Sequence, residues 1–192
     1  VMPASGGDAE PLTLPTWRPS GLVFSPDGSS IAVLAQGHDR AGFDGGNQVW
    51  EINVDGGEPT ALVGVGDWGS VAYRPDGVVY AAGVADLDAR PTNTNLYRLD
   101  GGQPEMLAPA LDRDIVMPVG GPQWVGDGAC RVMAEDRGRQ IVVHIADDGS
   151  HHEVPSDQPY VTGISVSADG SMTIATVTSP TNPGELVRLA AE

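Results

Sequence analysis

Phe24-Ser25-Pro26-Asp27-Gly28 is a turn-forming pentapeptide that recurs along this chain of 192 residues. Its pattern returns three more times, as Tyr73-Arg74-Pro75-Asp76-Gly77, Trp124-Val125-Gly126-Asp127-Gly128 and Val166-Ser167-Ala168-Asp169-Gly170. The successive Asp-Gly pairs are 49, 51 and 42 residues apart. Self-similarity at such a period predicts a propeller, a solenoid or another array of repeated units.

Each repeat is predicted to begin with a β-hairpin. An apolar or aromatic residue ends one strand, proline presets φ for the turn, and Asp-Gly supplies the left-handed corner before the next strand. A second turn follows in the repeats, at Gly56-Gly57, Gly101-Gly102 and Asp148-Gly149. Five residues beyond these turns stand Leu62, Leu107 and Val154. Gly6-Gly7 followed by Leu12 fits the same rule.

Between the two turns lies a strand with the template apolar-apolar-polar-apolar. Its four copies are Val49-Trp50-Glu51-Ile52, Leu96-Tyr97-Arg98-Leu99, Val142-Val143-His144-Ile145 and Leu186-Val187-Arg188-Leu189. Strands that are apolar on both faces, such as residues 31–34 and 78–82, must be covered on both sides. Four antiparallel strands per repeat predict an all-β protein of the β-propeller class, with about four blades in a partial or permuted ring.

Residues 1–192 are predicted to form one propeller domain, with repeats at about 17–64, 65–108, 118–155 and 161–192. Residues 1–16 would supply the last strand of a blade, over 10–14, and the fourth repeat lacks that strand. We therefore expect residues 8–14 to pair with the strand at 185–190, within one chain or between two, because an unpaired edge promotes aggregation. In a larger ring, exposed blade faces would instead drive self-association.

The composition describes a folded but strongly acidic chain. The hydrophobic content is 40%, the formal net charge is −16, and all ten basic residues are arginine. Such a surface repels a phosphate backbone, so we expect no nucleic-acid partner. The acidic residues are scattered through loops and strand ends, which indicates a solvated surface.

The sequence contains no signal for a membrane or for secretion. No apolar run approaches the roughly 18 residues of a spanning helix, and the N-terminus lacks a basic-then-apolar pattern, so we expect no membrane partner and a cytoplasmic location. Cys130 lies in an apolar run and is predicted to be a small buried residue. Val1 in place of an initiating methionine indicates a piece of a longer protein.

Catalytic signatures are weak in this sequence. Residues 163–167 are the nearest approach to the G-x-S-x-G elbow of hydrolases, but they end in Ser167 and fall inside a repeat strand. Residues 64–69 match G-x-G-x-x-G, yet a strand follows where a dinucleotide site needs a helix. We therefore predict that this chain alone is not an enzyme, and we interpret residues 64–69 as a loop between blades.

We predict no cofactor and no metal. His144 occupies the polar slot of its strand template, and the adjacent His151 and His152 point to opposite faces of a strand. Two Asp-x-Asp pairs, at 86–88 and 112–114, lack the further ligands of a calcium loop and are expected to be exposed acids.

The turns and strands resemble a known family of repeats. The Ser-Pro-Asp-Gly corner, the strand from Ser30 to Val33 and the Gly-Gly turn are similar to TolB-like propellers and to the propeller domain of the prolyl oligopeptidase family. Residues 134–139 and 178–186 are similar to the last propeller repeats of acylaminoacyl-peptidase-like members. The resemblance implies a following α/β-hydrolase domain with a Ser-Asp-His triad, which this sequence does not contain.

The loops opposite the Asp-Gly and Gly-Gly turns are the predicted binding surface, because loops on a rigid scaffold carry binding and Arg and aromatic residues anchor it. These loops are residues 37–46, 85–94, 135–139 and 178–183, and the connections before the first strands add aromatic residues. The candidate substrate- or partner-binding residues are Arg40, Arg90, Arg137 and Trp68.

Three of these candidates follow the second strand of successive repeats, so the repeat geometry predicts that Arg40, Arg90 and Arg137 lie on one face. Arginine binds carboxylates in a bidentate, planar manner. We expect this face to meet a hydrolase domain or the terminal carboxylate of a peptide. The alternative is that each arginine pairs locally with an acidic neighbour and contributes little. Those neighbours are Asp39, Asp86, Asp88 and Asp136.

The resemblance favours one function over two others. The leading interpretation is a non-catalytic propeller portion of a prolyl-oligopeptidase-family serine peptidase, which docks the hydrolase domain of the same parent chain or another protein and gates access of small peptides. The alternative is a free-standing TolB-like propeller that binds proteins. An enzyme formed by these residues alone ranks third. A homo-oligomer joined through open blade edges is compatible with either of the first two.

Overall fold

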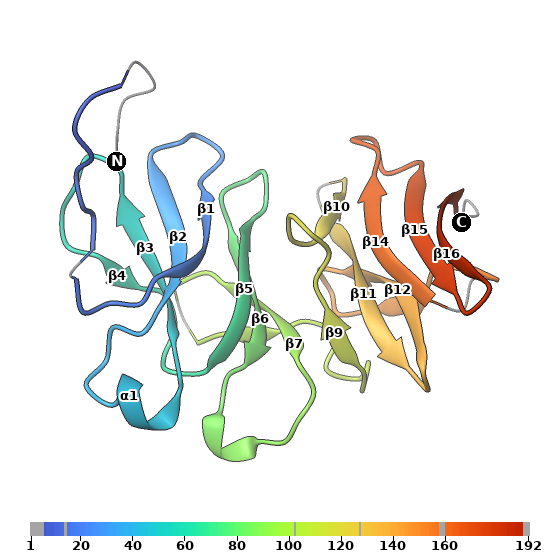
Figure 1. The fold of residues 1–192 in the computed structure, drawn as a ribbon, viewed down its shortest axis with the longest axis horizontal. Helices are drawn as coiled ribbons and strands as arrows, with labels where there is room; N and C mark the ends of the chain where they lie inside the picture. The colour runs from blue at the N-terminus through green and yellow to red at the C-terminus, as the bar shows by residue number, and fades with distance from the viewer. Residues whose placement is uncertain (1–5, 14, 102, 127, 158–159, 190–192) are drawn as a thin grey trace. The chain divides into compact units, whose positions relative to one another are not determined.

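The structure is a computed structural model that describes residues 6–13, 15–101, 103–126, 128–157 and 160–189. Two compact units make up the chain. The first comprises Val1–Arg90 and Arg98–Glu105, and the second comprises Pro91–Tyr97 and Met106–Glu192. Antiparallel sheets dominate the described residues, as predicted for the all-β propeller class (Figure 1).

The first half of the chain forms two four-stranded sheets, each with its strands in sequence order. One sheet contains β1 (Ser20–Phe24), β2 (Ser30–Ala35), β3 (Gln48–Asn53) and β4 (Thr60–Ala61). The other contains β5 (Asp67–Tyr73), β6 (Val79–Val84), β7 (Asn95–Leu99) and β8 (Glu105–Met106). Two short helices, α1 (Ala41–Asp44) and η1 (Leu87–Ala89), lie in the connections between the second and third strands (Figure 1).

The second half forms one larger sheet. Its strands are β9 (Asp114–Val116), β10 (Gln123–Val125), β11 (Ala129–Asp136), β12 (Arg139–Ala146), β13 (His151–Glu153), β14 (Tyr160–Val166), β15 (Thr173–Ser179) and β16 (Asn182–Arg188). Both β9 and β10 pair with β11, at different ends of that strand, so the first strand of this blade is split in two. A single parallel pair, Gln140 with Tyr160, joins β12 to β14 and merges two blades into one sheet.

Apolar residues fill the space between neighbouring blades within each unit. In the first unit the fully buried side chains of Trp68 and Tyr80 belong to β5 and β6. In the second unit one cluster joins strands of both blades, and its members are Met133, Val142, Val154, Val161, Ile164, Ala175, Val177 and Leu189. Cys130 is 2% exposed, as predicted for a small buried residue.

The repeated pentapeptide forms a hydrogen-bonded turn whose chemistry explains its recurrence. Ser25 Oγ donates to Asp27 Oδ1 at 2.7 Å, and the same oxygen accepts from Ser29 N at 3.0 Å and from Ser29 Oγ at 2.8 Å. Gly28 takes a left-handed φ of 73° and its N–H donates to Ser25 O at 2.9 Å. One aspartate therefore closes the turn from both sides, which is the usual role of Asp in such corners.

The same network is rebuilt in the fourth repeat. Asp169 Oδ1 accepts from Ser167 Oγ at 2.6 Å and from Ser171 N at 3.1 Å, and Gly170 again has a φ of 73°. In the second repeat, Asp76 Oδ1 accepts from Val78 N at 3.2 Å. The third corner contains Asp127, which lies outside the described residues.

The Asp27 and Asp169 turns predict an acid-sensitive contribution to stability. Hydrogen bonds from Ser25 and Ser29 lower the pKa of Asp27 from 3.8 to about 2, and those from Ser167 and Ser171 do the same for Asp169. A folded pKa below the unfolded one stabilises the fold above about pH 4, and this stabilisation is lost as the pH falls towards 2.

We expect the carbon-13 NMR signals of both carboxyl groups to titrate with midpoints near pH 2. Ser25→Ala removes the first donor to Asp27 and should raise that midpoint while leaving Asp169 unchanged. Equal midpoints before and after the substitution would show that the hydroxyl does not act on the carboxylate.

Three expectations about strands and loops were wrong. Residues 6–13 contain no strand in the described structure, so the predicted strand over 10–14 is not formed there, and residue 14 lies outside the described part. The expected loop at 135–139 is a hairpin in which only Arg137 and Gly138 connect β11 to β12. The expected loop at 178–183 is likewise a short turn between β15 and β16. The repeat pattern predicted the order of the strands, but not that β11, β12, β15 and β16 extend through the expected loops.

None of the helices in the described part of the chain has the length and apolar character needed to cross a bilayer.

Candidate functional site

Two of the predicted arginines line one surface hollow of the first unit. This hollow, called here the arginine hollow, has a volume of about 430 Å³. Its lining residues are Arg40, Asp44, Val65, Ala85, Asp86, Leu87, Asp88 and Arg90. The loop after β2 and the loop after β6 therefore contribute to one site, in accordance with the repeat geometry.

The loop after β2 is shaped by α1 and by a hydrogen bond between two side chains beside it. Asp44 accepts from Gly46 N at 2.9 Å and contacts His38 Nε2 at 3.0 Å. The hydrogen bond from Gly46, followed by that from His38, lowers the pKa of Asp44. Arg40 is exposed and has no salt bridge within 4 Å among the described residues, so its guanidinium can bind an anion. Phe43, in α1, is 91% exposed.

A glycine allows the two loops to meet. Gly46 is buried, and a Cβ there would lie 2.6 Å from Val65 Cγ1 and 2.8 Å from Leu87 Cδ1. Both of those side chains line the arginine hollow. Any larger residue at this position would displace the side chains of Val65 and Leu87 and so change the shape of the hollow.

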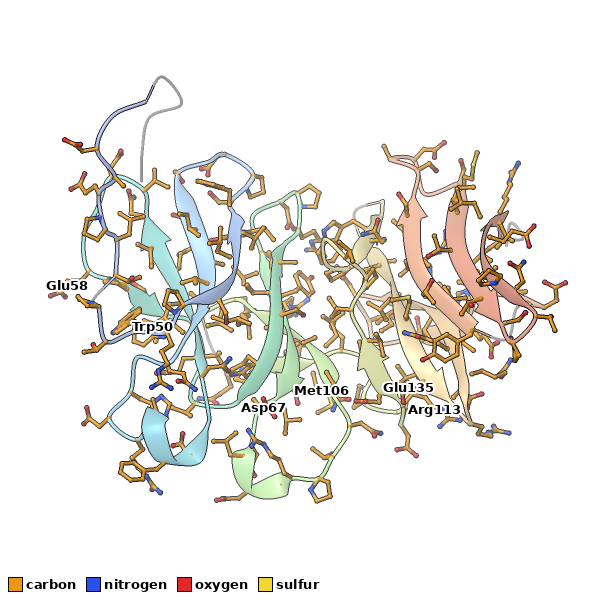
Figure 2. All side chains as sticks on the ribbon, viewed as in Figure 1. Trp50, Glu58, Asp67, Met106, Arg113 and Glu135 are labelled. Carbon is orange, nitrogen blue, oxygen red and sulfur yellow. The ribbon has the colours of Figure 1, made fainter. Side chains whose placement is uncertain are left out.

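The loop after β6 is shaped by a capped 3-10 turn. Asp86 Oδ1 accepts from Asp88 N at 2.9 Å and thereby caps η1. Arg90 follows that turn and contacts Asp67 at 3.2 Å, a partner that the sequence did not suggest. Asp67 begins β5 at the end of the blade near η1 (Figure 2). Both members of this pair are more than a third exposed, so the pair adds little stability and leaves Arg90 available to a ligand.

Trp68 was predicted as a surface anchor, and this expectation was wrong. The residue is only 2% exposed. Its indole N–H donates to Gly64 O at 3.2 Å, and its backbone N–H and C=O both bind the side chain of Asn47. A Cβ on Gly66 would lie 2.6 Å from its Nε1, so the ring packs directly against the backbone. Trp68 is a core residue that holds β5 against the preceding blade.

Arg137 belongs to the second unit, where it lies beside a buried carboxylate. Asp136 contacts Arg113 Nε at 2.8 Å, Arg139 Nη2 at 2.8 Å and Arg137 Nε at 3.4 Å. The Asp136 side chain is 8% exposed while that of Arg137 is 82% exposed. Hydrogen bonds from Arg139 and then Arg113 lower the pKa of Asp136. The local pairing expected as the alternative for Arg137 is therefore present.

The sequence did not reveal the importance of Arg113, which lies 23 residues before Asp136. Arg113 directly precedes β9 and lies at the same end of β11 as Glu135 (Figure 2). The Arg113-Asp114 dipeptide at the start of β9 contains no sign of a partner so far along the chain. Only the pairing of β9 with β11 brings Arg113 to the hairpin that carries Asp136.

The weaker motifs take structural roles. Ser165 lies within β14 opposite Ile174, and not at a strand-to-helix elbow. Of residues 64–69, the first three connect the blades and the last three begin β5, so a strand stands where a dinucleotide site needs a helix. Among the described residues no group of three or more His, Cys, Asp or Glu side chains could hold a metal ion. His144 and His152 pair across β12 and β13 and stack with ring centroids 4.8 Å apart.

Asp86 of the first predicted acidic pair caps η1, and one residue of the second pair also has a structural function. Asp114 is half-buried, and its Oδ1 accepts from Thr94 N at 2.6 Å. Its partner in the sequence, Asp112, is exposed and accepts from Asn93 Nδ2 at 3.3 Å. Asp114 therefore holds the first residue of β9 beside the residue that precedes β7.

Comparison with sequences of known proteins gave no match: no protein-family model matches the chain, and no curated protein matches it.

Solved structures of similar fold include two peptidases and a TolB protein. Acylaminoacyl peptidase of Pyrococcus horikoshii matches 91% of this chain with a TM-score of 0.67 and 15% identity. A puromycin-hydrolyzing peptidase of Mycobacterium tuberculosis matches 89% with a TM-score of 0.66 and 22% identity. TolB of Acinetobacter baumannii matches 89% with a TM-score of 0.61 and 13% identity.

The matched regions are only part of those proteins, because the chain covers 26% and 27% of the two peptidases and 40% of TolB. At these identities the likeness shows the fold alone. The predicted β-propeller class is confirmed, and so is the resemblance to acylaminoacyl-peptidase and TolB structures at the level of fold.

Proposed function

We propose that this chain is the non-catalytic β-propeller portion of a serine peptidase of the prolyl oligopeptidase family, and that it docks a hydrolase domain and gates access of small peptides. The observation that carries this proposal is the match of about nine-tenths of the chain to two peptidase structures. Fold likeness alone does not carry function, so the proposal also depends on the chemistry of a surface site.

The arginine hollow can bind the charged ends of a short peptide. Arg40 and Arg90 present guanidinium groups suited to a terminal carboxylate, while Asp86 and Asp88 can attract a terminal ammonium group. A charge-assisted hydrogen bond of this kind contributes roughly 1.5–3 kcal/mol. The chain has a net charge of −16, so most of its surface repels a carboxylate. Two arginines at one hollow reverse this repulsion locally and can bind that group.

Peptidase activity is expected in the intact gene product and not in the chain of residues 1–192. We expect the purified intact protein to hydrolyse short peptides and to lose this activity with a serine-directed inhibitor. The 192-residue chain should show no turnover under the same conditions, because Ser165 is in a strand interior without an elbow. Turnover by the pure 192-residue chain that the inhibitor abolishes would contradict the proposal.

A set of arginine variants tests the binding surface in the intact protein. Arg40→Gln should raise KM for short peptides about tenfold or more, since it removes a charge-assisted contact, while kcat changes less. Changing Arg40, Arg90 and Arg137 together to Gln should raise KM further or weaken binding of the hydrolase domain.

Arg18→Gln removes the same charge from an exposed position outside the hollow and is the matched control. If the triple variant has the same KM and the same interdomain stability as the control, the three arginines bind neither the peptide nor the hydrolase domain.

A free-standing TolB-like propeller that binds proteins is the second candidate, and the likeness to TolB supports it. The coding sequence and the intact mass of the native product separate the two candidates. A G-x-S-x-G elbow in the part of the product that follows Glu192 supports the peptidase, and a product without that elbow supports the binding module.

A further inference from the structure

Three arginines surround one carboxylate in the second unit, at the end of the hairpin formed by β11 and β12. Arg113 Nε and Arg139 Nη2 each lie 2.8 Å from an oxygen of Asp136, and Arg137 Nε lies 3.4 Å from one of them. We call these four residues the Asp136 cluster. Hydrogen bonds from Arg139 and then Arg113 lower the pKa of Asp136, so its carboxylate is ionised at neutral pH. One negative charge therefore faces three positive charges.

Two other acids lie beside the cluster in the described part of the chain. Glu153 Oε1 is 3.5 Å from Arg139 Nη1 and offsets one positive charge. Asp112 accepts from Arg113 only through its backbone oxygen, at 2.7 Å. The carboxylate of Asp112 instead accepts from Asn93 Nδ2 at 3.3 Å. The acids that contact the three guanidinium groups therefore leave one positive charge in excess.

The alternation of side chains along the strands separates the cluster from two further acids. Asp136 and Arg139 are Cα partners, so their side chains share one face of the hairpin. Glu135 and Asp114 are also Cα partners, and each directly adjoins a residue of the cluster in the sequence. Their side chains consequently point to the opposite face and do not neutralise the cluster directly.

The three guanidinium groups have donors that no protein acceptor uses. Among the described residues, no hydrogen bond is made by Arg113 Nη2, by Arg139 Nε or by either Nη of Arg137. The Arg137 side chain is exposed, so its contact with Asp136 adds little stability and leaves its guanidinium available. A guanidinium binds a carboxylate through two parallel hydrogen bonds, and the unused donors of the cluster are suited to such a contact.

The backbone at Arg137 indicates that this residue does not serve the turn. Arg137 has a φ of 50° and Gly138 a φ of 80°, the left-handed pair of a two-residue hairpin turn. Asn, Asp or Gly is preferred at the first of these positions, because a larger side chain is disfavoured in that conformation. Arginine therefore adds nothing to the turn except an exposed guanidinium group.

We propose that the Asp136 cluster is a binding site for the carboxylate of a small molecule, with Arg137 as its outermost contact. The site belongs to the second unit, is separate from the arginine hollow, and does not depend on the proposed peptidase function. A small ligand is favoured over an acidic protein because the net charge of −16 repels an extended anion. A single carboxylate is attracted at short range by the local excess of positive charge, since solvent ions screen the more distant acids.

Phenylglyoxal, which modifies accessible arginines, tests this site in the intact gene product. Mass spectrometry of the digested protein gives the modification rate of each arginine separately. N-acetylglycine at about twice its dissociation constant should slow the modification of Arg137 roughly threefold at constant ionic strength. N-acetylglycinamide, which lacks the carboxylate, should have no effect. An Arg137 that N-acetylglycine does not protect, or that is covered and does not react at all, would overturn the proposal.

Two other arginines in the same sample serve as controls. Arg18 is exposed and lies outside the cluster, so its modification rate should not change. Equal protection of Arg18 and Arg137 would mean that the ligand acts on every arginine, and would contradict a specific site. Protection of Arg40 without protection of Arg137 would support the arginine hollow and overturn the Asp136 cluster, so the two proposals can fail separately.

Two glutamate variants test whether the local excess of positive charge binds the ligand. Glu153→Gln removes the acid that offsets Arg139 and should lower the dissociation constant measured at Arg137 about threefold, the effect of one charge several ångströms away in water. Glu135→Gln makes the same change of charge on the opposite face and should leave that constant nearly unchanged. Equal effects of the two substitutions would show that the cluster is not the binding site.

Discussion

Replacement of Trp68 by alanine will lower the free energy of unfolding by roughly 3–5 kcal/mol, the usual cost of removing a fully buried aromatic side chain. Trp68 is 2% exposed and its ring lies against the backbone of Gly66. The substitution leaves a cavity at the contact between the first two blades, and Gly64 O loses its donor. Urea denaturation followed by far-ultraviolet circular dichroism measures the loss.

Phe43→Ala provides the control for this prediction. Phe43 lies in the same unit and is 91% exposed, so its removal should change the free energy of unfolding by no more than about 0.5 kcal/mol. A loss of stability in Trp68→Ala that is as small as in Phe43→Ala would show that the ring is not packed as described.

Gly83→Ala is expected to destabilise the first unit by roughly 3 kcal/mol, at the upper end of the cost of overpacking. Gly83 is buried in β6 as the Cα partner of Trp68. A Cβ there would overlap the carbonyl oxygen of Asp67 and lie 2.8 Å from Trp68 Cα. Backbone atoms cannot rotate out of the way, so β5 must move from β6. The same denaturation measurement checks this result.

Gly69→Ala is the matched control, since Gly69 lies in the adjacent strand and is exposed. The nearest atom to its Cβ would be Ala82 O at 3.8 Å, which is an ordinary contact. We expect a change within about 1 kcal/mol, because alanine also restricts the unfolded chain. Equal effects of the two substitutions would mean that backbone crowding at Gly83 does not control stability.

The sequence alone was sufficient to predict the turns and strands, because these depend on residues that are close together along the chain. Ser25, Asp27 and Ser29 close a turn with hydrogen bonds that span at most five residues, so the same letters produce the same corner wherever they recur. Strands apolar on both faces must be buried on both faces, which is why β2 and β6 could be placed as inner strands. The local pattern thus determined the repeat, the strand order and the propeller class.

The contacts between segments distant in sequence were set by the packing of blades. Trp68 follows a glycine-rich loop and suggested an exposed anchor, but the backbone of Gly66 and Gly83 leaves room for its ring in the core. Arg113 reaches Asp136 only because β9 pairs with β11. A repeat pattern states which positions are equivalent, whereas the neighbour of each side chain depends on the register and spacing of strands that meet only in the folded chain.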